Sequence, residues 1–219
     1  MGEAEHGSKT RLLDAALAVI RTKGYTATRI EDICEAAALT KGSFFHHFKS
    51  KDELALAAVE RWGAFASGVF AAAPYRDLPD PLDRLLGYVA FRKEILQGAL
   101  PEYTCLVGTM VQELYATHPV IRDACERCIG EHAAMVEADI QEAIVKYGIA
   151  PEWDASSLAL YTQAVIQGAF VLAKAKDGPG VAAACIDHLR RYLELLFMDS
   201  KERKKPHRIR GAARPAFDR

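Results

Sequence analysis

The sequence predicts an all-α protein. Alternating runs of β-branched residues bounded by Asn-Gly or Asp-Gly turns are nearly absent, so strands have little support. Apolar residues instead recur at spacings of three and four along most of the chain, which is the period of an amphipathic helix. The 219-residue chain is 50% hydrophobic and 26% charged. This balance is typical of a folded globular protein and excludes a disordered or collagen-like chain.

The first two helices are predicted from their end signals. A helix is expected over residues 8–23, because Gly24 follows it and glycine commonly ends helices. The segment Thr28-Arg-Ile-Glu31 matches a capping box, in which the hydroxyl and the carboxylate satisfy free backbone N–H groups at a helix start. We therefore expect a second helix from Thr28 to about Ala37.

Two further helix starts follow at once. Thr40 is a suitable N-cap for a short third helix ending near Phe48. The segment Ser50-Lys-Asp-Glu53 is another capping box, and it begins a longer helix that ends near Ala73. A long helix followed by two short helices with a tight connection is the layout of a helix-turn-helix DNA-binding domain.

The rest of the chain is predicted to form a bundle of helices. Asp80-Pro81 combines an N-cap with a proline in the first turn, which predicts a helix through Ile95. Gly108 is expected to kink a helix over residues 103–115. Further helices are expected over residues 119–147, 155–175 and 179–198.

Charge is unevenly distributed along the chain. Residues 1–51 hold 8 basic and 6 acidic side chains, residues 52–199 hold 12 and 21, and residues 200–219 hold 8 and 2. The ends are therefore basic and the middle is acidic, an arrangement that favours polyanion binding by the ends. For the basic tail at 200–219, added DNA affinity and a purely solubilising role are equally compatible with its composition.

Three segments of the first 54 residues resemble the TetR family of bacterial transcriptional regulators. These are Gly24-Tyr-Thr-Ala-Thr28, Ile33-Cys-Glu-Ala-Ala37 and Lys41-Gly-Ser-Phe-Phe-His-His-Phe-Lys-Ser-Lys-Asp-Glu-Leu54. The resemblance implies a helix-turn-helix DNA-binding domain at 1–51 and an all-helical effector-binding and dimerisation domain at 52–199. It also implies a homodimer that binds palindromic double-stranded operator DNA and is released, as a repressor, by a small-molecule effector.

Two positions depart from the family pattern. Ala38 replaces a customary glycine in the turn, so the turn is expected either to shift or to place alanine at a strained positive φ. Phe45 replaces a customary tyrosine, which removes a phenol that would contribute about 1 kcal/mol as a phosphate hydrogen bond.

The resemblance and the predicted third helix together give the candidate DNA contacts. Thr40 and Lys51, assisted by Lys49, are expected at phosphates, because helix starts attract anions. The start and outer face of the third helix are expected in the major groove. Phe44 and Phe48 are assigned to the core. The full candidate set is Thr28, Thr40, Lys41, Gly42, Ser43, Phe45, His46, His47, Lys49 and Lys51.

Effector and dimer contacts are predicted more loosely. Polar or aromatic residues on apolar helix faces are candidates for a ligand pocket, although each could equally belong to the core: Tyr88, Arg92, Tyr103, Gln112, Tyr115, His132 and Gln163. Arg92 could hold a carboxylate ligand in a bidentate manner. The small residues Gly168, Ala169 and Ala173 suggest close packing of the last helix pair, which the resemblance places at a dimer interface.

An alternative function rests on three residues of the middle segment. Cys125, Cys128 and His132 share one helix face and could bind zinc or sense redox state, although packing as small apolar residues is favoured. Glycine-rich phosphate loops, nucleophile elbows and paired carboxylates at informative spacing are not found, so neither an enzyme nor a cofactor is expected.

The expected location is the cytoplasm. The first residues do not resemble a secretory signal, and the most apolar stretch, at 158–173, is shorter than the roughly 20 residues of a membrane span. Five cysteines, an odd number, favour a reducing compartment over a disulfide framework.

Overall fold

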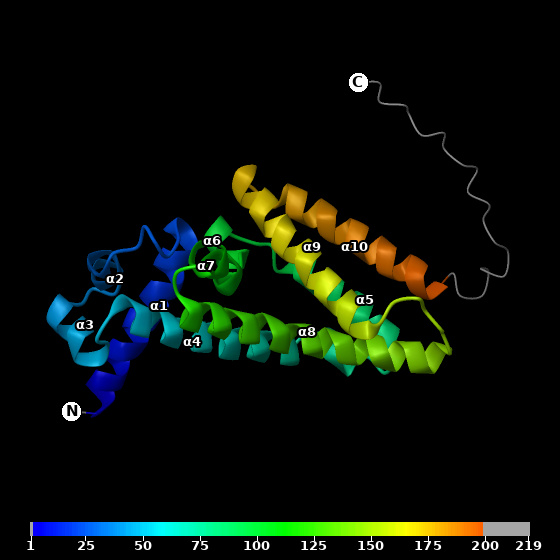
Figure 1. Ribbon diagram of the computed structural model, residues 1–219, viewed down its shortest axis with the longest axis horizontal. Coiled ribbons are helices and arrows are strands. Elements are labelled where there is room, and N and C mark those ends of the chain that lie inside the picture. Colours follow the sequence, from blue (N-terminus) through cyan, green and yellow to red (C-terminus); the bar gives the residue numbers. More distant parts are fainter. Residues whose placement is uncertain (1, 199–219) are drawn as a thin grey trace, which may run out of the picture.

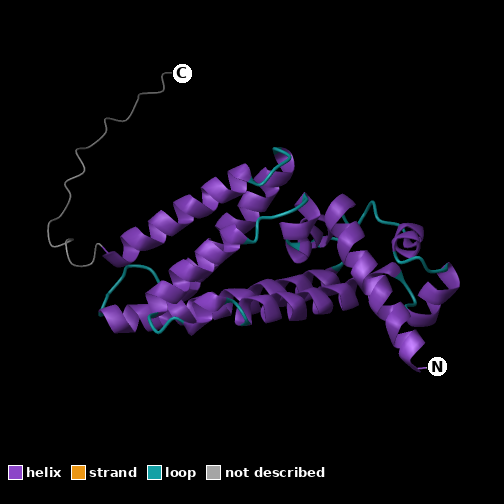
Figure 2. Cartoon of the chain, turned by 180° about the vertical axis from the view of Figure 1, so that it is seen from behind, coloured by secondary structure: helices purple, strands orange, loops and turns teal. Residues whose placement is uncertain are grey.

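The computed structural model describes residues 2–198, and all regular structure in this part is helical (Figure 2). The all-α prediction is confirmed. The basic tail predicted at 200–219 lies outside the described residues. The elements are α1 (Gly2–Lys23), α2 (Ile30–Ala36), α3 (Lys41–His47), α4 (Lys51–Ala71), η1 (Pro74–Asp77), α5 (Pro81–Glu94), α6 (Leu100–Tyr103), α7 (Leu106–Leu114), α8 (Pro119–Tyr147), α9 (Ala155–Ala175) and α10 (Gly180–Met198).

The molecule has a small head of three helices at one end of an elongated body (Figure 1). Helices α1, α2 and α3 form the head, and α4 leads from it into the body, where it packs along α8. Helix α9 packs between α8 and α10, and α5 contacts both α8 and α10. We call α1–α3 the head and α4–α10 the body.

Two apolar cores support this arrangement. One lies within the body and includes Phe70, Tyr88 and Phe170. The other centres on the head, but it also contains Leu106 of α7 and Ile121 of α8. Because the second core spans the junction, the head is continuous with the body, and α1 packs on α4, α6 and α7.

The start of α2 differs from the prediction. The helix begins at Ile30, with Arg29 as its N-cap, so the capping box predicted at Thr28 is wrong. The Thr28 hydroxyl donates instead to the Gly24 carbonyl over 2.6 Å, while the Asp32 carboxylate accepts from the Arg29 N–H over 2.7 Å. Because the helix begins two residues after Thr28, Arg29 and not Thr28 occupies the N-cap position.

The next two helix starts agree with their predicted caps. The Thr40 hydroxyl accepts from the Ser43 N–H over 3.2 Å, and the Ser50 hydroxyl accepts from the Glu53 N–H over 3.1 Å. The Glu53 carboxylate accepts from the N–H of Lys49 over 2.6 Å, one residue before the position that a capping box requires.

The single helix predicted over residues 103–115 is two helices. Helix α6 ends at Tyr103 and α7 begins at Leu106, so the break lies at Thr104 and Cys105, and Gly108 lies inside α7. A Cβ on Gly108 would lie 2.1 Å from the side-chain oxygen of Gln167 on α9. The glycine thus serves close packing between α7 and α9, which sequence alone does not distinguish from a kink.

Helices α9 and α10 form the predicted pair, but two of the proposed interface residues are internal. Ala169 and Ala173 are 1% and 0% exposed and lie in the body core, so they are unavailable to a partner. Gly168 is exposed, and a Cβ there would meet no atom within 4 Å. The outward apolar face of the pair instead consists of Leu160, Tyr161, Val171, Leu172, Tyr192 and Leu195.

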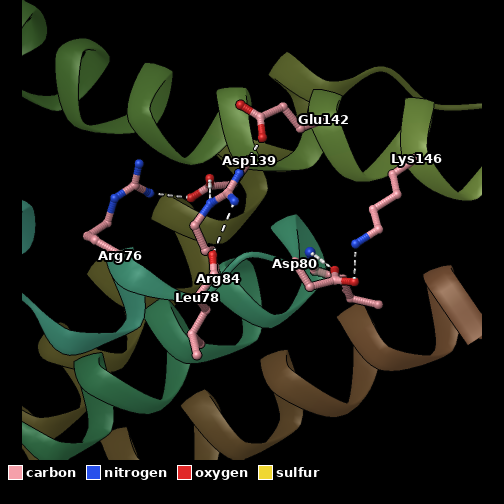
Figure 3. Close-up of polar contacts among 8 residues, drawn as sticks. Arg76, Leu78, Asp80, Arg84, Asp139, Glu142 and Lys146 are labelled. Atoms are coloured by element: carbon pink, nitrogen blue, oxygen red, sulfur yellow. Dashed lines mark hydrogen bonds and ion pairs between the residues drawn. The ribbon is translucent and has the colours of Figure 1, made fainter.

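A group of ion pairs joins α5 and η1 to α8 (Figure 3). The buried Asp139 carboxylate accepts from Arg76 over 2.5 Å and from Arg84 over 2.7 Å. Arg84 also pairs with Glu142. Nearby, Lys146 pairs with Asp80 over 2.6 Å, and Asp80 caps α5 by accepting from the Leu82 N–H over 2.9 Å, as predicted. These contacts fix the far end of the body.

Two helices, α4 and α9, are long and apolar enough by composition to cross a membrane. This is weak evidence, because core helices of soluble proteins meet the same test. Both helices contribute to the apolar cores, through residues such as Leu54 on α4 and Ile166 on α9.

Candidate functional site

Helix α3 presents one face outward and buries the other. Phe44 and Phe48 are 0% and 2% exposed, as predicted, and anchor the helix in the head core. Phe45 is 54% exposed. The exposed positions that accompany it are Lys41, Gly42 and His46. A short helix with a fully anchored back face and a polar outer face suits insertion into a DNA groove.

The turn before α3 contains the expected strain. Ala38 has φ +50°, so the alanine occupies the left-handed region that glycine prefers. Arg11 on α1 donates to the carbonyl of Ala37 over 2.5 Å and to that of Ala38 over 3.2 Å. These bonds brace the turn from α1, a role for Arg11 that the sequence analysis did not identify.

Two of the three lysines predicted to meet DNA, Lys41 and Lys51, already have side-chain partners within the chain. Lys41 pairs with Glu31 on α2. The Lys51 ammonium donates to the carbonyls of Tyr25 and Thr28 over 3.1 and 2.9 Å, and it lies 4.1 Å from the centre of the Tyr25 ring. Lys51 therefore holds the loop before α2 against the start of α4. Lys49 is exposed beside it.

Three other predicted DNA contacts are placed differently from one another. Thr28 is 1% exposed and its hydroxyl is used internally, so its side chain cannot reach DNA in this arrangement. The hydroxyl of Thr40, an exposed residue, caps α3. His47 is half-buried, with its Nε2 2.6 Å from the Ser8 hydroxyl. Arg29 was missed, yet its side chain is 74% exposed at the start of α2.

A shallow surface hollow lies between the start of α2 and the start of α3. Arg29, Lys41, Phe45 and Lys51 line it together with the loop before α2. Three cationic side chains thus surround one exposed aromatic ring. Glu31 also lines the hollow and pairs with Lys41, and Arg29 pairs with Asp32, so the starts of α2 and α3 carry three cations beside two carboxylates. The cations are positioned to meet a polyanion if these exposed pairs exchange.

A cavity of about 240 Å³ lies where the head meets the body. Its lining comes from α1, α4, α5, α6, α7, α8 and α9 and from short connecting segments, and is mostly apolar. Of the predicted ligand residues, Arg92, Tyr103, His132 and Gln163 line it. Gln112 and Tyr115 do not line it. Gln112 is exposed on α7, and Tyr115, directly after the end of α7, is 62% exposed. The lining also contains residues that the sequence did not indicate: Arg21, Trp62, Phe65, Phe70, Glu102, Cys105, Cys128, Glu131, Gln167 and Phe170.

The polar wall of the cavity is formed by Arg92, His132 and Gln163, which converge on the buried hydroxyl of Tyr88. Tyr88, a predicted ligand residue, is 1% exposed and is not itself part of the lining. Arg92 Nε and Gln163 Nε2 donate to this oxygen over 3.0 and 2.9 Å. His132 Nε2 lies 3.0 Å from the same oxygen and 2.8 Å from an Arg92 Nη atom. Burial and the neighbouring Arg92 lower the pKa of His132 to about 3, so the imidazole is neutral at physiological pH.

The opposite part of the lining includes a residue of the head. Arg21, near the end of α1, donates through Nε to the Thr104 carbonyl over 2.9 Å. Its guanidinium lies 4.5 Å from the centre of the Trp62 ring. One Nη atom is buried without a hydrogen-bond partner among the described residues. Burial lowers the pKa of this guanidinium, and a buried donor without an acceptor is unfavourable.

Two family models match the chain in succession. The model described as "Bacterial regulatory proteins, tetR family" matches residues 12–58, and the model described as "Tetracyclin repressor-like, C-terminal domain" matches residues 81–189. The chain belongs to the TetR family. Regulators of this family are DNA-binding proteins without enzymatic activity. The first match covers the head and the start of α4, and the second covers most of the body.

Relatives and solved structures agree with this assignment. "Transcriptional regulator AcuR" of Cereibacter sphaeroides is 30% identical over 105 residues, 48% of each chain, so the match spans about half the length of that relative. An uncharacterised helix-turn-helix regulator of Lactococcus lactis is 27% identical over 85% of this chain and 93% of its own. A crystal structure of a TetR regulator from Chloroflexus aurantiacus, 27% identical, has a TM-score of 0.77 and covers 87% of this chain and 96% of its own.

The zinc or redox alternative is not supported for this TetR-family chain. Among residues that the structure describes, no group of three or more His, Cys, Asp or Glu side chains could hold a metal ion. His132 faces Tyr88 and Arg92. Burial raises the pKa of Cys125 to about 12 and that of Cys128 to about 11, so both thiols stay protonated and are poor ligands or nucleophiles.

Polar contacts also tie the TetR-type head to its body. The Glu113 carboxylate on α7 accepts from the backbone N–H groups of Tyr25 and Thr26 over 3.1 and 2.8 Å. Tyr25 in turn donates its hydroxyl to Asp52 on α4. The loop that precedes α2 is thus held by α7 and by α4. Helix α7 also lines the cavity through Val107, so it contacts both the cavity and the head.

Proposed function

We propose that this chain is a cytoplasmic repressor that binds a palindromic operator as a homodimer and releases it when a small molecule enters the cavity. One observation carries the proposal: the cavity is lined both by Arg21 of the head and by Arg92, His132 and Gln163 of the body. A ligand there makes contacts that depend on how the head sits on the body. Differential contacts of this kind are what a ligand needs to shift a conformational equilibrium.

The DNA contacts divide into two roles. Lys41, Ser43 and His46 read base edges from α3, while Thr40, Lys49 and Lys51 meet phosphates. Support comes from the outward position of α3 and from the basic hollow beside it. On binding, Lys41 exchanges its ion pair with Glu31 for an acceptor on DNA. Two of the three ammonium N–H groups of Lys51 donate to backbone carbonyls, and the third donates to a phosphate.

The homodimer forms through the outward face of α9 and α10. This face carries the contacting rings of Tyr161 and Tyr192, 5.2 Å apart, together with exposed Leu172. Gly168 lies on the exposed side of α9 and would let a partner helix approach closely. An apolar exposed face of two neighbouring helices is a suitable self-complementary interface for a two-fold dimer.

Release follows from geometry rather than from competition. Two recognition helices must meet major-groove faces about 34–36 Å apart on one side of B-DNA. A ligand that moves α7 acts on the head through Glu113, and a small tilt of each head spoils simultaneous docking. Linkage then requires the ligand to bind free dimer more tightly than operator-bound dimer by the same factor.

The test of DNA recognition begins with selection of an operator by the full-length protein from random DNA, followed by fluorescence anisotropy. Lys41→Ala and Ser43→Ala should change the preference among operator variants by about 1–3 kcal/mol per base contact. Lys51→Ala should weaken binding to all sequences and reduce the salt slope by about one. Lys146→Ala, far from the head, is the control. A uniform loss in all three head variants would refute the division of roles.

The dimer is tested separately by analytical ultracentrifugation. Leu172→Glu places a charge on the proposed interface and should yield monomer at micromolar concentration, with weaker operator binding. Val120→Glu introduces the same charge at a 64% exposed position on α8 and should leave the dimer intact. A Leu172→Glu protein that remains dimeric would place the interface elsewhere.

A further inference from the structure

Two arginines line the cavity without a carboxylate partner. Among the described residues, neither Arg21 nor Arg92 forms an ion pair, whereas Arg76 and Arg84 both pair with Asp139. Removing a guanidinium from water is unfavourable unless an anion or several acceptors compensate. Glu102 and Glu131 also line the cavity, but among the described residues neither forms an ion pair with Arg21 or Arg92, so a ligand carboxylate can pair directly with either guanidinium.

At one wall, hydrogen-bond donors outnumber acceptors. Arg92 and Gln163 both donate to the Tyr88 oxygen, and Arg92 also donates to His132 Nε2. The neutral imidazole offers only one acceptor lone pair, so the hydroxyl of Tyr88 competes with Arg92 for it. The Arg92 guanidinium lies 4.3 Å from the centre of the Phe70 ring, which supplies a weak attraction to the charge but no lone pair. A carboxylate would satisfy the surplus donors.

At the other wall, Arg21 has a buried Nη atom without an acceptor. Glu102 also lines the cavity, and its charge partly offsets the effect of burial on the pKa of Arg21. Its carboxylate accepts from the backbone N–H of Ala99 over 2.5 Å and forms no ion pair with Arg21. Arg21 belongs to α1 of the head, whereas Arg92 belongs to α5 of the body. A ligand that contacts both arginines therefore depends on how the head is placed on the body. Apolar side chains, including Ile95, Val107 and Phe170, make up much of the remaining lining.

We propose that the effector is an amphipathic organic diacid, with one carboxylate on Arg92, an apolar middle, and a second carboxylate on Arg21. The proposal rests on the proposed function, because it names the ligand class of the same cavity. The cavity volume of about 240 Å³ lies below the roughly 300–1,000 Å³ typical of drug-sized ligands, which favours a short chain. Such a ligand joins α5 of the body directly to α1 of the head, so its binding depends on their relative position.

The probes are α,ω-dicarboxylates from succinate to suberate, with hexanoate and hexanamide as matched compounds. Binding to the full-length, DNA-free protein is measured by isothermal titration calorimetry. One chain length should bind best, hexanoate should bind more weakly, and hexanamide weaker still. Each lost charged contact should cost about 10- to 100-fold in affinity. Equal affinities for hexanamide and hexanoate, or no binding by any acid, would overturn the proposal.

Substitutions test which arginine binds each carboxylate of the ligand. Arg92→Gln should weaken hexanoate and the best diacid alike, whereas Arg21→Gln should remove only the advantage of the diacid over hexanoate. Arg21→Lys, which keeps the charge, should retain part of that advantage. Lys93→Gln is the control. Lys93 follows Arg92 on α5 but pairs with Asp187 outside the cavity, so its replacement should leave all ligand affinities unchanged. A diacid advantage that survives in Arg21→Gln would show that Arg21 does not contact the ligand. Circular dichroism checks that each variant is folded.

The proposed function and this inference fail in different ways. Operator selection uses no ligand, and calorimetry uses no DNA. A protein that selects a palindrome but binds none of the acids overturns the ligand class alone. A protein that binds a diacid through Arg21 and Arg92 but selects no DNA overturns the regulator proposal alone.

Discussion

The body contains two arginine clusters that differ in how the charge is balanced. At the far end, Arg76 and Arg84 converge on the buried Asp139 carboxylate, and Glu142 completes the group (Figure 3). At the cavity, Arg92 meets only a phenol oxygen and an imidazole nitrogen. The first cluster is electrostatically complete, whereas the second has donors to spare. Complete pairing indicates a structural role, and incomplete pairing beside a cavity indicates a binding role.

The two clusters should therefore respond differently to loss of one member. Removing the Asp139 carboxylate from the first leaves the buried Arg84 with Glu142 alone and Arg76 without a carboxylate partner among the described residues, which is unfavourable. Removing the cation from the second leaves neutral groups that can pair with one another, because Tyr88 can still donate to His132 and accept from Gln163.

The largest effect is expected for Asp139→Ala. Arg84, whose side chain is only 12% exposed, would keep Glu142 as its single carboxylate partner, and Arg76 would have none among the described residues. The free energy of unfolding should fall by about 3–5 kcal/mol in urea denaturation. A loss below about 1 kcal/mol would mean that water compensates these arginines, and the contrast between the clusters would disappear.

The cavity cluster should give a pH dependence of stability. The folded-state pKa of His132 lies at about 3, below its ordinary value of 6.5. Between these values the unfolded chain binds a proton that the folded chain excludes, so stability falls as pH decreases through this window. The slope should reach at most about 1.4 kcal/mol per pH unit.

His132→Gln should flatten that slope between pH 7 and 4.5. Asp80 provides a separate window, because Lys146 first, and then hydrogen bonds from Tyr147 and the Leu82 N–H, lower its pKa to about 2 despite desolvation. Its contribution is lost only below its ordinary value of 3.8, outside the measured range. An unchanged slope in His132→Gln would show that another group titrates.

Arg92→Gln should change stability by about 1 kcal/mol or less. The substitution removes a cation without a carboxylate partner among the described residues, so the loss of two hydrogen bonds is offset by relief of desolvation. Urea denaturation of ligand-free protein measures the change. A loss as large as that of Asp139→Ala would assign Arg92 a structural role instead.

The smallest effect is expected for Lys146→Met. The Lys146 side chain is 49% exposed where it pairs with Asp80, and exposed pairs contribute about 0.2–1 kcal/mol. Raising the salt concentration should reduce the difference between this variant and the parent, because exposed pairs are screened. A difference that is independent of salt would indicate lost packing of the lysine stem.

Local signals in the sequence predicted much of the fold. Thr40, Ser50 and Asp80 cap their helices as expected, because an N-cap needs only a side-chain oxygen and an N–H two or three residues away. The same signal failed at Thr28, since the helix begins at Ile30 with Arg29 as its N-cap and the Thr28 hydroxyl donates to the Gly24 carbonyl. It also failed to divide α6 from α7, where the Thr104 carbonyl at the break accepts from Arg21 on α1, a contact between residues distant in sequence.

The candidate site was predicted less completely. Arg92, His132 and Gln163 meet at the cavity, as polar groups on apolar faces suggested. Gln112 and Tyr115 carried the same signal but lie on an outer surface. A polar residue on an apolar stripe shows that a helix face is mixed, but not which neighbour covers it. Arg21 gave no signal at all, because it reads as one more basic residue of a DNA-binding head.

The sequence by itself determined the all-α class, most helix bounds, the helix-turn-helix head and the membership of the TetR family, since these depend on spacing and capping within a few residues. Only the tertiary structure decided that Ala169 and Ala173 face inward, that Asp139 completes one arginine cluster, and that Arg21 and Arg92 line one cavity. These facts arise where helices distant in sequence pack together, and the burial that sets their energies exists only after that packing.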